Sequence, residues 1–191
     1  MDRSVGAGYS IPMTWFQALN PLLVIVMTPL FVAHWTRQAA RGREPAPARK
    51  MALGALGVAA AYAMLAAVSG ATGQAPASWM WLALFFLVLT AGELYILPVG
   101  LGLFARLAPA SHRATTIAAW FFAAFGGNLL AGLLGTWWSR VGHASFFAAM
   151  AGLATLAAVL LWLLDRPLRQ LEAGHAGADG QRVPGPALRV D

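Results

Sequence analysis

Glu93 is the residue in this sequence with the clearest potential for chemistry. It is the only charged side chain between Trp79 and Ala105, and it lies near the middle of that apolar stretch. Burying an ionised carboxylate in hydrocarbon costs several kcal/mol, so such residues usually face a bundle interior or a wet cavity and are usually functional. Apolar surroundings favour the protonated acid and a bound cation favours the carboxylate. Glu93 therefore predicts a site for a proton or a ligand amine.

Two structural alternatives for Glu93 compete with this interpretation. A permanently protonated Glu93 could hydrogen-bond to a neighbouring helix, and the sequence leaves this alternative open. A salt bridge to an intramembrane cation is the other, but the interiors of the apolar segments contain no Lys or Arg. A cationic partner for Glu93 would therefore come from a ligand or from another part of the protein.

Polar side chains also occur in the first apolar segment. Gln17, Asn20 and Thr28 are spaced so that they share one face of a helix. Amides at this depth need hydrogen-bond partners, so they predict either contacts between helices or the wall of a pocket. Pro21 and Pro29 interrupt the backbone ladder, which a membrane tolerates only where the backbone faces protein or water.

Trp120 stands out among the tryptophans because the other seven lie near the ends of apolar segments. Trp120 lies inside a segment, where its ring either packs against neighbours or forms an aromatic wall. Small residues follow it at helical spacing and predict a close helix contact. They are Ala123, Gly127, Ala131 and Gly135.

The motifs of common enzyme classes are absent from the sequence. It contains no HExxH, GxSxG, P-loop or Rossmann fingerprint. The four histidines lie at segment ends or in loops, and there is no cysteine. We therefore expect no enzyme activity, no catalytic residue, no metal site and no cofactor.

The composition indicates that lipid is the solvent for much of the chain. Of its 191 residues, 59% are hydrophobic and 10% are charged, against about 25% charged in soluble domains. A membrane-spanning helix needs about 20 apolar residues. Five segments qualify, which predicts an all-α membrane protein with five transmembrane helices. They cover about residues 14–35, 51–69, 79–105, 115–137 and 146–164.

The charges predict the orientation of these helices in the membrane. Nine cations fall in loops on one side, and Arg3 and Arg140 fall on the other. Since cytoplasmic loops carry an excess of Lys and Arg, residues 1–13 are expected outside and residues 165–191 in the cytoplasm. The same clustering of cations in loops explains the high pI, so the pI does not indicate nucleic-acid binding. The tail from Ala173 is rich in Gly, Ala and Pro, which predicts disorder.

Three blocks of the sequence resemble one transporter family. The resemblance covers about residues 10–168, and the block around Glu93 is its most specific part. The chain is similar to the proton-dependent oligopeptide transporters, which are peptide/H⁺ symporters of the major facilitator superfamily. The blocks are FQALNPLLVIVMTPLFVAHW (16–35), GELYILPVGLGLFARLAP (92–109) and AAWFFAAFGGNLLAG (118–132).

The resemblance implies a register and a set of roles. The five segments are similar to helices eight to twelve of a twelve-helix fold. Glu93 then binds the α-amino group of a peptide, Asn20 helps to line the site, and Trp120 forms an aromatic wall. Many members have Ser or Thr four residues after this tryptophan, where this sequence has Ala124. The family's ExxER proton-coupling motif and the cations that hold the peptide carboxylate belong to its N-terminal half, which this sequence does not match.

We interpret the sequence as the C-terminal part of a proton-coupled di/tripeptide symporter, expected in a bacterial inner membrane. It would supply the amine side of a midplane substrate site, with the proton as coupling ion. It is expected to be incomplete alone, with a missing N-terminal half as partner if the gene is split. The alternative is a non-transporting membrane interaction protein or regulatory subunit, in which Glu93 is a contact between helices.

Overall fold

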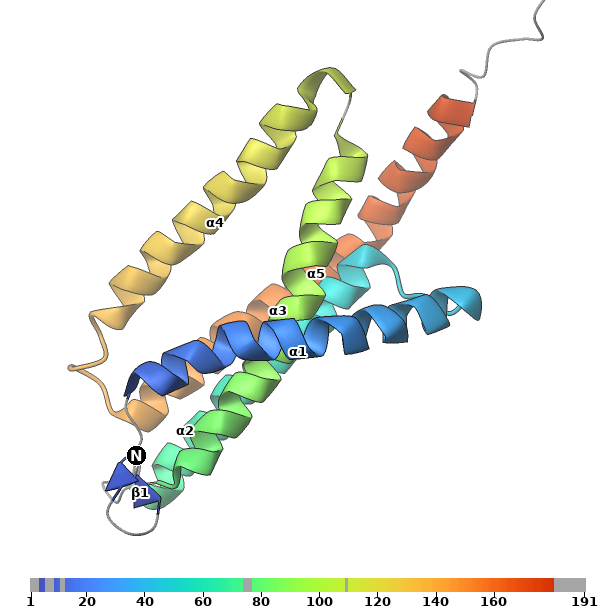
Figure 1. The fold of residues 1–191 in the computed structure, drawn as a ribbon. Helices are drawn as coiled ribbons and strands as arrows, with labels where there is room; N and C mark the ends of the chain where they lie inside the picture. The colour runs from blue at the N-terminus through green and yellow to red at the C-terminus, as the bar shows by residue number, and fades with distance from the viewer. Residues whose placement is uncertain (1–3, 6–8, 11–12, 74–76, 109, 181–191) are drawn as a thin grey trace, which may run out of the picture.

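Five helices make up the architecture in the computed structural model, which describes residues 4–5, 9–10, 13–73, 77–108 and 110–180. A two-residue antiparallel pair, β1 (Ser4–Val5) with β2 (Tyr9–Ser10), precedes them. The 3₁₀ turn η1 (Ala110–His112) leads into the fourth helix. The helices, drawn in Figure 1, are α1 (Met13–Ala40), α2 (Pro47–Thr72), α3 (Trp79–Leu107), α4 (Arg113–Gly135) and α5 (His143–Gly180).

Each of the five helices contains a stretch long and apolar enough to cross a membrane, which confirms the predicted all-α fold. Most helices extend beyond the apolar segments that predicted them. The largest difference is at α5, which continues to Gly180, although the sequence predicted its span to end at Leu164 and disorder from Ala173. Leu, Arg, Gln, Glu and Ala between residues 168 and 173 are good helix formers, which explains the extension as far as Ala173. The rest of the predicted disordered tail, residues 181–191, lies outside the described residues.

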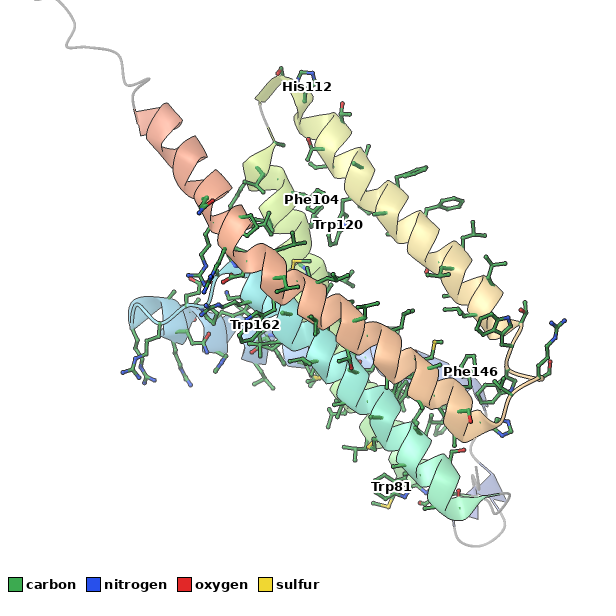
Figure 2. All side chains as sticks on the ribbon, turned by 180° about the vertical axis from the view of Figure 1, so that it is seen from behind. Trp81, Phe104, His112, Trp120, Phe146 and Trp162 are labelled. Atoms are coloured by element: carbon green, nitrogen blue, oxygen red, sulfur yellow. The ribbon has the colours of Figure 1, made fainter. Side chains whose placement is uncertain are left out.

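The packed centre of the molecule lies where α2 contacts both α3 and α5. Ala61, Leu65 and Phe85 are buried there. Partly buried side chains from all three helices, including Tyr62, Phe86 and Phe147, surround them. Figure 2 shows α2 and α5 side by side. This contact holds α2 in place, and α2 in turn supports α3.

The remaining two helices are less covered by the chain itself. α1 crosses α3, and α4 stands away from the other helices along most of its length (Figure 1). Large apolar side chains on α4 are exposed, for example Phe122 at 76%. In a membrane protein such faces meet lipid or other helices instead of water.

A buried acid joins the beginning of α2 to α5. Asp165 is only 3% exposed. Its Oδ2 accepts hydrogen bonds from Arg49 Nε at 2.9 Å and from Arg169 Nη2 at 2.8 Å. The Arg49 guanidinium also lies 5.8 Å from the ring centre of Trp162. These contacts satisfy the carboxylate and fasten α2 to α5.

We expect Asp165→Asn to destabilise the chain because it leaves both arginines without their counter-ion. Removing one partner of a fully buried pair costs about 3–5 kcal/mol. Both arginines are about half exposed, so we expect about 1–2 kcal/mol. The measurement is the free energy of unfolding in lipid–detergent micelles. Arg166→Gln, an exposed neighbour, is the control, and equal stability of the two variants would contradict this assignment.

Candidate functional site

Asn20 of α1 and Glu93 of α3 meet where the two helices cross. Asn20 Nδ2 donates a hydrogen bond to Glu93 Oε2 at 2.9 Å, and both residues are partly buried. Glu93 lies near the middle of the 29-residue helix α3. The structure thus brings together two of the three site residues that the sequence predicted, although they are 73 positions apart.

Aromatic contacts between α1 and α3 stabilise the same crossing at a second place. The Tyr95 ring lies 5.3 Å from the Phe31 ring and 5.6 Å from the Trp35 ring, both edge-on. Residues two apart on a helix point in nearly opposite directions. Glu93 and Tyr95 therefore contact different parts of α1, and together they fix where α1 crosses α3.

Trp120 of α4 packs against a later part of α3 and does not share the Asn20–Glu93 contact. Its ring centre is 5.2 Å from that of Phe104. A Cβ atom placed on Gly100 would overlap the end of the Trp120 ring, so a larger residue there would require the ring to move. Figure 2 shows Trp120 and Phe104 facing each other between α4 and α3.

Helical geometry nevertheless places Trp120 on the Glu93 side of α3. Residues at i, i+7 and i+11 lie on one helical face, and Glu93, Gly100 and Phe104 have this spacing. At 1.5 Å per residue, Gly100 is about 10 Å along the axis from Glu93. This face of α3 therefore carries the Glu93 carboxylate at mid-helix, and the Trp120 ring of α4 packs on it about two turns further along.

Two further polar residues of α1, Gln17 and Thr28, were predicted to share a helical face with Asn20. Thr28 is exposed, and its hydroxyl donates to the Val24 carbonyl in its own helix, so it does not join Asn20. The side chain of Gln17 lies outside the described residues.

Sequence reasoning missed Gly100 as a residue of this region. Its signal was a glycine inside a helix, where glycine normally costs about 1 kcal/mol relative to alanine.

The charges around the crossing leave Glu93 without a cationic partner within the described part of the chain. The ion pairs found there join Asp165 to Arg49 and Arg169, and Glu44 to Lys50. Lys50 Nζ lies 5.1 Å from the Trp35 ring centre, on the α2 side of the aromatic contacts. An amide donor can orient a carboxylate but cannot neutralise it, so this arrangement suits a proton or an ammonium group.

The described residues contain no group of three or more His, Cys, Asp or Glu side chains that could hold a metal ion. The site is instead an acid, an amide and an aromatic ring, placed on apolar helices. Comparison with known proteins identifies the family to which the chain belongs.

The profile of the POT family (PTR2) matches residues 1–150, so the chain belongs to the POT family. It is 34% identical over 182 residues to the peptide transporter YePEPT of Yersinia enterocolitica. It is 29% identical over 169 residues to a di-/tripeptide transporter of Lactococcus lactis. These matches cover 89% and 87% of this chain but 34% and 33% of the relatives. The chain thus spans about a third of the length of these relatives, which are transporters and not enzymes.

Solved structures show the same fold. A crystal structure of the peptide transporter POT in complex with sulfate matches with a TM-score of 0.79 at 27% identity. That match covers 87% of this chain and 33% of the other. A POT structure in complex with alafosfalin matches with a TM-score of 0.81 at 27% identity, covering 90% and 35%. The chain is therefore an integral membrane protein with part of the POT transporter fold.

Cross-linking tests the Asn20–Glu93 contact directly, because the chain has no native cysteine. In proteoliposomes, the Asn20→Cys/Glu93→Cys variant should be bridged rapidly by a short bis-methanethiosulfonate reagent. Ile25→Cys/Glu93→Cys is the control, since Ile25 is on the same helix and 72% exposed. Equal rates for the two pairs would mean that α1 does not cross α3 as described.

Proposed function

We propose that this chain supplies the amine-binding side of a substrate site in a proton-coupled di/tripeptide symporter. Glu93 is the counter-ion of the peptide α-amino group. Asn20 orients the Glu93 carboxylate, and Trp120 forms an apolar wall for the peptide. The proton is the coupling ion, and no cofactor is needed.

The observation that carries this proposal is the orientation of Glu93. Its carboxylate lies at mid-helix, accepts one hydrogen bond from Asn20, and forms none of the ion pairs in the described residues. A carboxylate has room for several hydrogen-bond donors. An ammonium group supplies both the missing charge and further donors, which makes a peptide amine a fitting ligand.

The same chemistry gives a route to proton coupling. Without a ligand, apolar surroundings favour the neutral acid, and a bound ammonium favours the carboxylate. Arrival of the amine is thereby linked to loss of the proton from Glu93. For the peptide and the proton to move together, the released proton must pass to another acid, in the part of the transporter outside this chain. In the POT relatives this exchange would take place between two halves of the transporter that rock about a midplane site.

Trp120 and Ala124 would influence which peptides bind. An indole ring about two turns from Glu93 fits an apolar side chain of the peptide. Ala124 offers no hydroxyl where many relatives have one, so this side of the site would favour apolar over polar substrate groups.

The proposal includes a location and a partner. The excess of cations on one side supports an N-terminus outside and a C-terminus in the cytoplasm of a bacterial inner membrane. The peptide carboxylate would be held by residues outside this chain, in the N-terminal half of the transporter. If the gene is split, that half is a separate protein partner.

One observation favours the alternative, a non-transporting interaction protein or regulatory subunit. Glu93 does form a contact between helices, as that alternative expects. The two functions differ in whether they need the negative charge of Glu93. A glutamine at position 93 keeps an oxygen that can accept the Asn20 hydrogen bond, but it cannot carry the negative charge.

We therefore predict that Glu93→Gln abolishes concentrative dipeptide uptake when this sequence forms part of a complete transporter. Losing one partner of a desolvated charge pair costs about 3–5 kcal/mol, which is about a hundredfold or more in affinity. The helix contact should survive, so the unfolding midpoint should change little. Uptake of a radiolabelled dipeptide and thermal unfolding are measured on the same preparation.

Glu172→Gln is the matched control for this experiment, because it removes an acid beyond the candidate span that ends at Gln170. It should leave uptake unchanged. Normal uptake by Glu93→Gln would refute the amine-site proposal. Loss of stability together with loss of uptake would favour the interaction protein instead.

A further inference from the structure

The backbones of α2 and α3 lie very close to each other at Gly54 and Gly92, next to Glu93. A Cβ atom placed on Gly54 of α2 would lie 2.6 Å from the Gly92 carbonyl oxygen of α3. A Cβ atom on Gly92 would lie 2.7 Å from the Gly54 carbonyl oxygen. Both glycines are buried. The contact is reciprocal and involves backbone on both sides, so neither residue can be enlarged without a movement of the helices.

This contact fixes the rotation of α3 at the residue that precedes Glu93. Consecutive residues on a helix are separated by about 100° of rotation. When Gly92 faces α2, Glu93 therefore points sideways from the α2–α3 interface, toward α1. The observed hydrogen bond to Asn20 is the result of this orientation.

Tyr95 is positioned by the same contact. A Cβ atom on Gly54 would lie 2.7 Å from Tyr95 Cβ and 2.8 Å from Ile96 Cγ1. The Tyr95 ring in turn packs against Phe31 and Trp35 of α1. A change at Gly54 would thus disturb both contacts by which α3 holds α1, although Gly54 itself lies on α2.

We propose that Gly54 is a positioning residue for the substrate site, and that its contact with Gly92 aims the Glu93 carboxylate at Asn20. The proposal deepens the function proposed above and rests on it for its significance. The part of the proposal that concerns helix geometry does not depend on peptide binding. The Asn20–Glu93 contact should depend on the size of residue 54 even when no peptide is present.

Cross-linking of the Asn20→Cys/Glu93→Cys pair in proteoliposomes measures this geometry. Adding Gly54→Ala should slow the bridging reaction about tenfold or more, because misplacements of about 1 Å are enough for such losses. Gly57→Ala is the matched control on the same helix. A Cβ atom there would lie 3.5 Å from Gly92 Cα, which is ordinary contact, so the rate should not change.

Helix content and the unfolding midpoint are measured for each variant to separate misdirection from misfolding. If Gly54→Ala does not fold, Gly54→Ala/Ile96→Ala replaces it, because this variant relieves the overlap with Ile96 Cγ1 and keeps the overlaps with Tyr95 Cβ and the Gly92 carbonyl oxygen. A folded variant with slow bridging supports the proposal. A folded variant with the parental rate overturns it, as does an equal loss in Gly57→Ala.

Peptide uptake then separates this proposal from the proposed function. Slow bridging in Gly54→Ala together with normal uptake by Glu93→Gln would support the positioning role of Gly54 and refute the amine site. In a complete transporter, Gly54→Ala should weaken uptake of dipeptides, with a rise in KM. The effect on KM should be far smaller for Gly57→Ala.

Discussion

The cost of placing one carboxylate among apolar helices is the constraint on which this structure depends. Glu93 can remain at the centre of α3 only if it is protonated or if other groups compensate its charge. Within the described residues, the compensation is a single amide hydrogen bond from Asn20. A ligand with a positive charge would complete it. This incomplete compensation distinguishes Glu93 from Asp165, whose two arginines already satisfy it.

The packing of the helices serves to orient this one group. The contact of α2 with α5, fastened by Asp165 and Arg49, gives α3 a firm support. The Gly54–Gly92 contact then sets the rotation of α3, and Tyr95 holds α1 across it through Phe31 and Trp35. Asn20 and Trp120 come from helices that the chain itself covers little. These two residues of the proposed site therefore lie on helices that further helices of a transporter would cover.

The sequence predicted the helices well because a span of apolar residues has a direct physical requirement for length. It also identified Asn20 and Glu93, since polar groups at membrane depth are rare and must find partners. The residues alone do not show that these two meet, because a contact over 73 positions depends on how α1 crosses α3, and only the family resemblance placed them in one site. Gly54, Gly92 and Gly100 were missed as positioning residues for the same reason, since their importance lies in what would overlap with a Cβ atom. At α5, apolarity predicted the span but not the whole helix, which continues through good helix formers as far as Ala173 and then on to Gly180.

Carbodiimide labelling of Glu93 tests most directly whether this carboxylate receives a peptide amine. A hydrophobic carbodiimide modifies protonated carboxyl groups in apolar surroundings, and mass spectrometry follows the modification of Glu93 in a reconstituted complete transporter that contains this sequence. Dialanine should slow the labelling, because its amino group pairs with the carboxylate. N-acetyl-dialanine, which lacks that amino group, should not. Equal labelling rates with the two peptides would contradict the account.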